Sequence, residues 1–143
     1  MINIKQELEV AKKASETAAE LLIDNKDDIN KILSNEGRDV KLKADLESER
    51  VIKEYLLANS DFPILAEESG ANEDLGNSFW VVDPLDGTSN YSRDFPMCCI
   101  SIALIYEKEI TLGVINDFNR GSLYEGSIDS RAKLNGVDIF VSS

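Results

Sequence analysis

The first part of the chain has the hydrophobic spacing of amphipathic helices. Apolar residues recur every three or four positions over Ile4–Asn25, with lysine and glutamate between them, so we predict a helix there. Its small side chains favour close packing against a neighbour over insertion into a membrane surface. The spacing breaks at Asn35–Arg38. A second helix is expected after Asp45, which can serve as its N-cap, and it should end near Ser60.

The second part of the chain contains short runs of β-branched and aromatic residues separated by turn residues. These runs predict strands at Pro63–Ala66, Phe79–Val82, Cys98–Tyr106, Ile110–Ile115, Ser122–Glu125 and Val137–Val141. The tripeptide Glu107–Glu109 is a predicted hairpin turn between two of them. Helices followed by strands are typical of an α+β architecture, so we predict two N-terminal helices packed on a mainly antiparallel sheet.

The length of 143 residues supports one domain, or part of a larger one, which we place at 1–143. There are 15 Lys and Arg against 27 Asp and Glu, a net charge of −12, and no basic cluster, which argues against a nucleic-acid partner. The most apolar run, Met97–Tyr106, is shorter than the roughly 20 residues that span a bilayer. No secretory signal is present at Met1–Glu9. We therefore expect no membrane partner and a cytoplasmic location.

The chain contains no histidine, and its only two cysteines, Cys98 and Cys99, are adjacent. Adjacent residues of a strand point to opposite faces, so the pair supplies neither a disulfide framework nor a zinc site. A histidine-based triad and a histidine-ligated metal are also excluded within these residues. The chemistry must therefore depend on carboxylates, hydroxyls and backbone groups.

The most informative segment is Phe79–Asn90, in which a hydrophobic strand leads directly into two acids three positions apart. Pro84 biases Asp83 toward an extended conformation, so the strand should continue to that carboxylate. A turn can then bring Asp86 back toward the same point. Asp83, Asp86 and the carbonyl of Leu85 are the oxygen ligands that Mg²⁺ prefers, and Mg²⁺ leaves positions for water and phosphate.

A phosphate site is indicated directly after these acids. Gly87 lets backbone approach a ligand closely, and if Thr88 opens a helix, its free N–H groups favour an anion. A second acidic pair, Glu67–Glu68, follows the predicted strand Pro63–Ala66 and can meet Asp83 at one edge of the sheet. Clustered carboxylates repel one another, and a bound cation is one way to relieve that repulsion.

Each motif alone also has a simpler interpretation. A DxxDG string is commonly a surface turn whose acids are solvated. Glu67–Glu68 can be the start of a solvated loop, and Asp45 can be a helix cap. Asp117 and Asp129 have the same default interpretation as solvated acids. From the residues taken one by one, these alternatives stay open.

The combination is more specific. The segments LAEESG, WVVDPLDGTSNY, FP, SIAL, GVI and LNGVDI follow one another at residues 65–70, 80–91, 95–96, 101–104, 113–115 and 134–139. In this order they resemble the inositol monophosphatase family of magnesium-dependent, lithium-sensitive phosphatases. The resemblance implies metal-assisted, in-line hydrolysis of small phosphomonoesters such as inositol, sugar or polyol phosphates. It also implies the N-terminal half of a layered α/β/α/β/α sugar-phosphatase fold.

The resemblance carries roles to particular residues. It implies that two or three Mg²⁺ ions are held by Glu67, Asp83, the Leu85 carbonyl, Asp86 and Glu68. Thr88 and Glu67 are implied as the pair that activates the attacking water, with Asp45 polarising Thr88. The phosphate is implied to bind at Gly87, Thr88 and Ser89.

Two features depart from the family pattern. Family members are about twice this long, and their second half supplies a WDxAA-type motif whose Asp completes the metal site. No such segment occurs here, and the only tryptophan, Trp80, belongs to the DPLDGT strand. Leu42 stands about where many members carry a threonine. The chain therefore resembles the N-terminal half of such a phosphatase, for which we expect an exposed apolar face and weakened metal binding. The apolar face favours a homodimer or other self-association, the alternative being a poorly stable monomer.

Three other functions are alternatives to phosphomonoester hydrolysis. The adenosine 3′,5′-bisphosphate nucleotidase branch of the family tends to carry Lys-Glu-Phe after DGT, whereas this chain has Ser89-Asn90-Tyr91. A non-catalytic binding or interaction module that retains a metal site is a further alternative. A calcium-binding protein is disfavoured because no EF-hand pattern of spaced acids is present.

Overall fold

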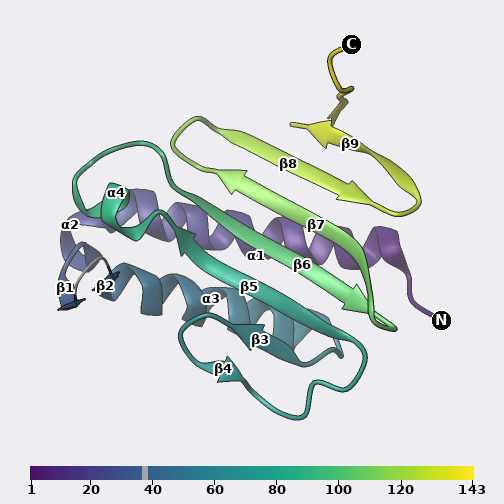
Figure 1. The fold of residues 1–143 in the computed structure, drawn as a ribbon, viewed down its shortest axis with the longest axis horizontal. Coiled ribbons are helices and arrows are strands. Elements are labelled where there is room, and N and C mark those ends of the chain that lie inside the picture. Colours follow the sequence, from purple (N-terminus) through teal and green to yellow (C-terminus); the bar gives the residue numbers. More distant parts are fainter. Residues whose placement is uncertain (37–38) are drawn as a thin grey trace.

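The computed structural model describes residues 1–36 and 39–143. In chain order its elements are α1 (Ile4–Asp24), α2 (Lys26–Ile29), β1 (Ile32–Glu36), β2 (Asp39–Leu42), α3 (Lys43–Asn59), β3 (Ile64–Ala66), β4 (Gly70–Ala71), β5 (Phe79–Asp86), α4 (Thr88–Ser92), β6 (Cys99–Tyr106), β7 (Glu109–Asp117), β8 (Ser122–Ser127), β9 (Ser130–Leu134) and β10 (Val137–Asp138) (Figure 1). The two predicted long helices are confirmed as α1 and α3.

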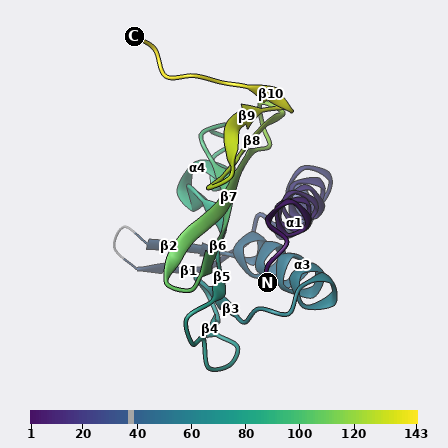
Figure 2. The same ribbon diagram turned by 90° about the vertical axis from the view of Figure 1, so that its right-hand side faces the viewer.

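Eight strands form one sheet in the order β10-β9-β8-β7-β6-β5-β3-β4. All neighbouring strands are antiparallel except β3 and β5, which are parallel. β1 and β2 form a separate antiparallel hairpin. Figure 2 shows α1 and α3 on the same side of the large sheet. The predicted α+β architecture, with helices on a mainly antiparallel sheet, is therefore confirmed.

The core lies between the two long helices and one face of the sheet. The register sets Val82, Ile102 and Val114 side by side on β5, β6 and β7, and all three are buried. Alanines on α1 are fully buried, which lets this helix pack closely. Apolar burial on this scale is the main force that holds the helices on the sheet. Within the described residues, no helix is both long and apolar enough to cross a membrane.

The start of the second long helix differs from the prediction. α3 begins at Lys43, with Leu42 in the N-cap position, and Asp45 is the third residue of the helix. The Asp45 carboxylate accepts a hydrogen bond from the Leu42 backbone N–H at 2.8 Å. The prediction of Asp45 as N-cap was therefore wrong, because the free N–H groups of a first turn can also be satisfied from inside the helix.

Several strands differ from the predicted runs. β5 extends past Val82 to Asp86, while the last predicted strand is reduced to Val137–Asp138. The elements α2, β1, β2, β4 and β9 were not predicted. Part of the predicted break at Asn35–Arg38, residues 37 and 38, lies outside the described residues. The hairpin turn is confirmed at Glu107 and Lys108, which both have positive φ, as a two-residue primed turn requires.

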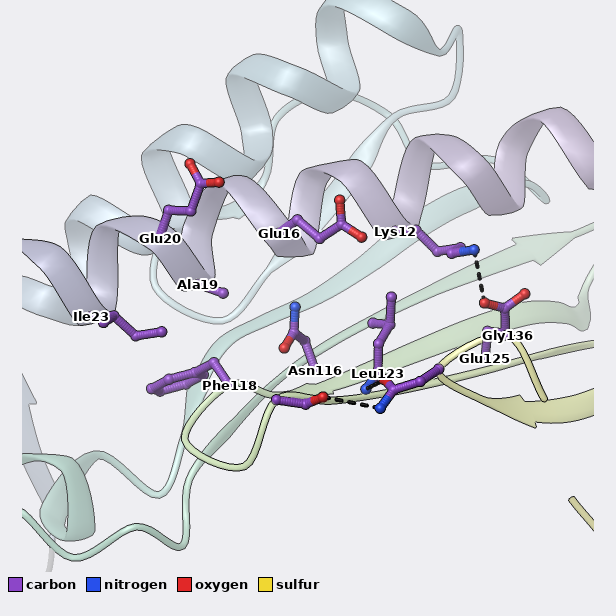
Figure 3. A pocket seen from close by; sticks show the side chains of 12 residues that line it. Lys12, Glu16, Ala19, Glu20, Ile23, Asn116, Phe118, Leu123, Glu125 and Gly136 are labelled. Carbon is purple, nitrogen blue, oxygen red and sulfur yellow. Dashed lines mark hydrogen bonds and ion pairs between the residues drawn. The ribbon is translucent and has the colours of Figure 1, made fainter.

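A groove of 590 Å³ runs between α1 and the ends of β7 and β8 (Figure 3). Lys12 of α1 spans it and contacts Glu125 of β8 at 2.9 Å. None of the residues predicted for the metal or phosphate site lines this groove. It therefore lies on the helix side of the sheet and away from the candidate chemistry.

The sheet face opposite the long helices carries apolar and small side chains. The register aligns Val81, Ala103, Gly113 and Gly126 across four strands on this face, which we call the open face. A cavity of 400 Å³ on it is lined by residues that include Ala103, Ile115 and Tyr124. Ile115 is 46% exposed. A contiguous apolar surface of this kind is a protein-interaction surface in many soluble proteins.

We predict that the chain self-associates through the open face. Replacing Ile115 with glutamate should raise the dissociation constant by about tenfold or more, because one isoleucine loses its buried area in the contact. Analytical ultracentrifugation over a concentration series measures this. Leu57→Glu is the matched control, because Leu57 is 54% exposed on α3, on the other side of the sheet. A wild-type chain that stays monomeric at every concentration contradicts the prediction.

Candidate functional site

The candidate site is built on a bulge near the end of β5. Asp83 pairs with Ser101 of β6, and Asp86 pairs with Cys99, so three steps on β5 oppose two on β6. Pro84 lies inside this bulge, where its missing N–H interrupts no ladder bond. The bulge breaks the alternation of faces. Asp83 is on the open face, Leu85 is buried and Asp86 is exposed at the strand end.

One face of α3 carries buried polar residues that hold this region in place. Asp45, Ser48 and Glu49 follow the helical spacing i, i+3, i+4 and are all buried. The Ser48 hydroxyl donates to the Pro84 carbonyl at 2.7 Å. The Glu49 carboxylate accepts from the Glu68 backbone N–H at 2.8 Å. Neither Ser48 nor Glu49 was predicted as a site residue, although three polar residues on an otherwise apolar helix face were a usable signal.

Asp45 and Thr88 form the central hydrogen bond of the site. The Thr88 hydroxyl donates to Asp45 Oδ1 at 2.7 Å and also lies 3.2 Å from the Leu85 carbonyl oxygen. Asp45 is only 1% exposed, and burial raises the pKa of its carboxyl, while the hydrogen bonds from Thr88 and Leu42 oppose that rise. The bond joins α3 to the first residue of α4, which lie 43 positions apart in the sequence.

Gly87 allows the chain to turn sharply between β5 and α4. Its φ is 89°, in the left-handed region that favours glycine. A Cβ at this position would lie 2.7 Å from the Met97 carbonyl oxygen, so no other residue fits without a backbone shift. Thr88 begins α4, as expected, and Ser89 follows in the same short helix. The backbone N–H groups of this turn are therefore placed at the end of β5.

Glu67 and Asp83 are brought together, as predicted from the two motifs. Because β3 and β5 are parallel neighbours, their ends meet at one edge, and the Glu67 N–H donates to the Val82 carbonyl at 3.2 Å. Burial and hydrogen bonding to Asp83 raise the pKa of Glu67 to about 7, and the charges of Asp83, Glu68 and Asp45 add to this. Burial and the charge of Asp86 also raise the pKa of Asp83, against the hydrogen bond to Glu67.

Glu68, the other acid of the second pair, forms an ion pair with a lysine. Its side chain is 6% exposed, and its Oε2 atom forms an ion pair with Lys41 Nζ at 2.7 Å. Lys41 was not predicted, because a lone lysine in a sequence gives no sign of its partner. Within residues 1–36 and 39–143, no three acidic or cysteine side chains converge closely enough to enclose a metal ion. The structure therefore brings Glu67 and Asp83 into contact, and the charges of Asp86 and Glu68 are near enough to raise the pKa of Asp83.

Comparisons with known proteins agree with this architecture. A profile described as "Inositol monophosphatase family" matches residues 3–143. The Nus factor SuhB of Xylella fastidiosa is 38% identical over 97% of this chain and 51% of its own length. The fructose-1,6-bisphosphatase/inositol-1-monophosphatase of Aquifex aeolicus is 34% identical over 99% of this chain and 54% of its own length.

A solved structure agrees as well. The inositol monophosphatase of Anabaena superposes with a TM-score of 0.83 at 31% identity, over 99% of this chain and 51% of that chain. The chain thus spans about half the length of the relatives it matches.

Removing the Thr88 hydroxyl should destabilise the fold. In Thr88→Val, the buried Asp45 Oδ1 loses its donor, so we expect the free energy of unfolding to fall by about 1 to 3 kcal/mol. Urea unfolding followed by circular dichroism measures this. Thr88→Ser keeps the hydroxyl and should lose less than half as much. An equal loss in both variants would show that the hydroxyl contributes no more to stability than the methyl group of Thr88, and would contradict the prediction.

The metal-free protein should become less stable as the pH rises. The folded pKa of Glu67, about 7, lies above its ordinary value of 4.5, so between these values the folded state holds more protons than the unfolded state. Glu67→Gln should therefore raise the free energy of unfolding above pH 7, by about 1 kcal/mol or less because Glu67 is solvent-exposed. Below pH 4 the gain should vanish.

Urea unfolding in a chelator at several pH values tests this expectation. Glu73→Gln is the control, because Glu73 is exposed in the loop before β5. A gain for Glu67→Gln that does not change with pH would contradict the assignment to ionisation of Glu67.

Proposed function

Because the chain belongs to the inositol monophosphatase family, we propose that it carries the catalytic loop for magnesium-dependent hydrolysis of small phosphomonoesters. The observation that carries this proposal is the contact between Glu67 and Asp83 beside the anchored DPLDGT loop. The substrate class is an inositol phosphate or a related sugar or polyol phosphate. The adenosine 3′,5′-bisphosphate nucleotidase activity found elsewhere in the family is the second candidate.

The donor set fits a hard divalent cation. Burial raises the pKa of both Glu67 and Asp83, and Asp83 raises the pKa of Glu67 further, so a cation between the two carboxylates would oppose these shifts. Mg²⁺ usually takes one or two protein carboxylates and completes its shell with carbonyls, water and substrate oxygens. We propose that Glu67, Asp83 and the Leu85 carbonyl hold one ion, that Asp83 and Asp86 hold a second, and that Glu68 contributes through water.

Bound Mg²⁺ supplies a Lewis acid for the phosphoryl oxygens and lowers the pKa of coordinated water. Thr88 is the residue we propose to orient the attacking water. Its hydroxyl hydrogen faces Asp45 and the Leu85 carbonyl, which are both acceptors, so its oxygen lone pairs are free to accept a hydrogen bond from water. Glu67 is proposed as the neighbouring base.

The phosphate is proposed to bind at the turn from β5 into α4. The N–H groups of Gly87, Thr88 and Ser89 lie at the start of α4, where no preceding helical carbonyl accepts them. Such N–H groups bind anions well. The left-handed Gly87 brings this backbone to the end of β5, next to the proposed metal ligands.

Three further properties belong to the proposal. The chain is proposed to act in the cytoplasm, to self-associate as a dimer and to be sensitive to lithium. These expectations come from the family resemblance and the sequence pattern, and the apolar open face supports self-association.

The proposal is tested by phosphate release from inositol 1-phosphate, fructose 1,6-bisphosphate and adenosine 3′,5′-bisphosphate, with and without Mg²⁺. Asp83→Asn should lower magnesium-dependent release by about a hundredfold or more, because it removes a charged ligand without changing shape. Asp28→Asn is the control, because Asp28 is an exposed aspartate of α2.

The result also separates the alternative functions. Release that is strongest from the adenosine compound would favour the nucleotidase branch. Magnesium binding without release from any of the three would favour a non-catalytic module. Release that Asp83→Asn leaves unchanged would contradict the proposed site.

A further inference from the structure

A cavity of 390 Å³ lies directly beside the DPLDGT loop, on the side away from the long helices. Asp86 and Gly87 line it, and so do Asp117 at the end of β7 and Arg120 in the turn between β7 and β8. Its volume is in the range of small-molecule sites. The proposed phosphate-binding backbone and the Arg120 region therefore share one cavity.

The sheet topology explains why these residues meet. β5 and β7 both run antiparallel to β6, which lies between them, so β5 and β7 end at the same edge of the sheet. Asp86 ends β5 and pairs with Cys99, where β6 begins. Asp117 ends β7 at this edge. Any ligand held at Gly87 that extends across β6 thus approaches the β7–β8 turn.

Arg120 is the one lysine or arginine among the described residues that line the cavity. One of its terminal nitrogens lies 3.0 Å from Asp117 Oδ2. The Arg120 side chain is 58% exposed, whereas that of Asp117 is 16% exposed. The largely buried carboxylate therefore fixes one edge of the guanidinium, and the other N–H donors of that group remain available.

We propose that Arg120 binds a second anionic group of the substrate, so that the site prefers small sugars or polyols with two phosphates over those with one. This inference rests on the proposed function. A guanidinium suits a phosphate because it donates two parallel hydrogen bonds. Asp117 acts as a positioning residue that holds the guanidinium toward the cavity and touches no substrate.

The test compares the binding of inositol 1-phosphate and fructose 1,6-bisphosphate in the presence of Mg²⁺. Dissociation constants come from rapid NMR titrations, recorded before measurable phosphate release, of the wild type, Arg120→Met, Arg120→Lys and Arg131→Met. Arg131→Met is the matched control, because Arg131 lies on β9 against the ring of Phe140 and does not line the cavity.

Arg120→Met should weaken binding of the bisphosphate by about tenfold or more, the loss expected for a charge-assisted hydrogen bond, while binding of the monophosphate changes less than about twofold. Arg120→Lys should recover part of the loss, and Arg131→Met should change neither ligand. Equal weakening of both ligands, or no change in either, overturns the role of Arg120 and leaves the proposed function standing. A wild-type chain that binds neither ester overturns both.

Discussion

The candidate site depends on one buried hydrogen bond, from the Thr88 hydroxyl to the Asp45 carboxylate. It ties the loop after β5 to the first turn of α3, and α3 itself is held by apolar packing on the sheet. A carboxylate this deeply buried is costly unless its oxygens are satisfied. Thr88 and the Leu42 N–H satisfy them, so the position of the loop is fixed by the same contacts that keep Asp45 in the protein interior.

The bulge at Pro84 sets the positions of the candidate site residues at the end of β5. Along an uninterrupted strand, Asp83 would share a face with Leu85, and the turn would leave the sheet in a different direction. The extra residue buries Leu85 and turns its carbonyl toward the Thr88 hydroxyl. The Ser48 hydroxyl, which donates to the Pro84 carbonyl, supports the bulge from α3. The contacts of Ser48 and Leu85 therefore both stabilise the fold and position the candidate site.

The sequence predicted the parts of this structure that depend on local pattern. The helix over Ile4–Asn25 follows from periodicity, and the strand at Phe79–Val82 follows from its run of aromatic and β-branched residues. The meeting of Glu67 with Asp83 follows from two acids at the ends of predicted strands. The start of α3 was misjudged, because an aspartate can satisfy helix N–H groups from the N-cap or from the first turn, and the spacing is compatible with both.

Contacts between segments that are distant in the sequence could not be predicted from hydrophobic patterns or motifs. Lys41 and Glu68 are brought together by the placement of the β1–β2 hairpin, which no periodicity encodes. The pairing of Arg120 with Asp117 was local enough to find, but its meaning depends on the sheet order that sets β7 beside β6 and β6 beside β5. The roles of these residues therefore depend on how the hairpin and the strands of the sheet are arranged in space.

The charge of the chain constrains how a phosphate ester reaches the site. With a net charge of −12, the protein repels an anionic ligand at long range, and Glu67, Asp83 and Asp86 add to that repulsion at short range. A cation bound between these acids reverses the local sign, so metal binding and phosphate binding must favour each other. Arg120 lines the cavity from the turn between β7 and β8. Under the proposed function, attraction of the substrate would therefore be divided between a cation bound by the acids and the guanidinium of Arg120, which Asp117 holds.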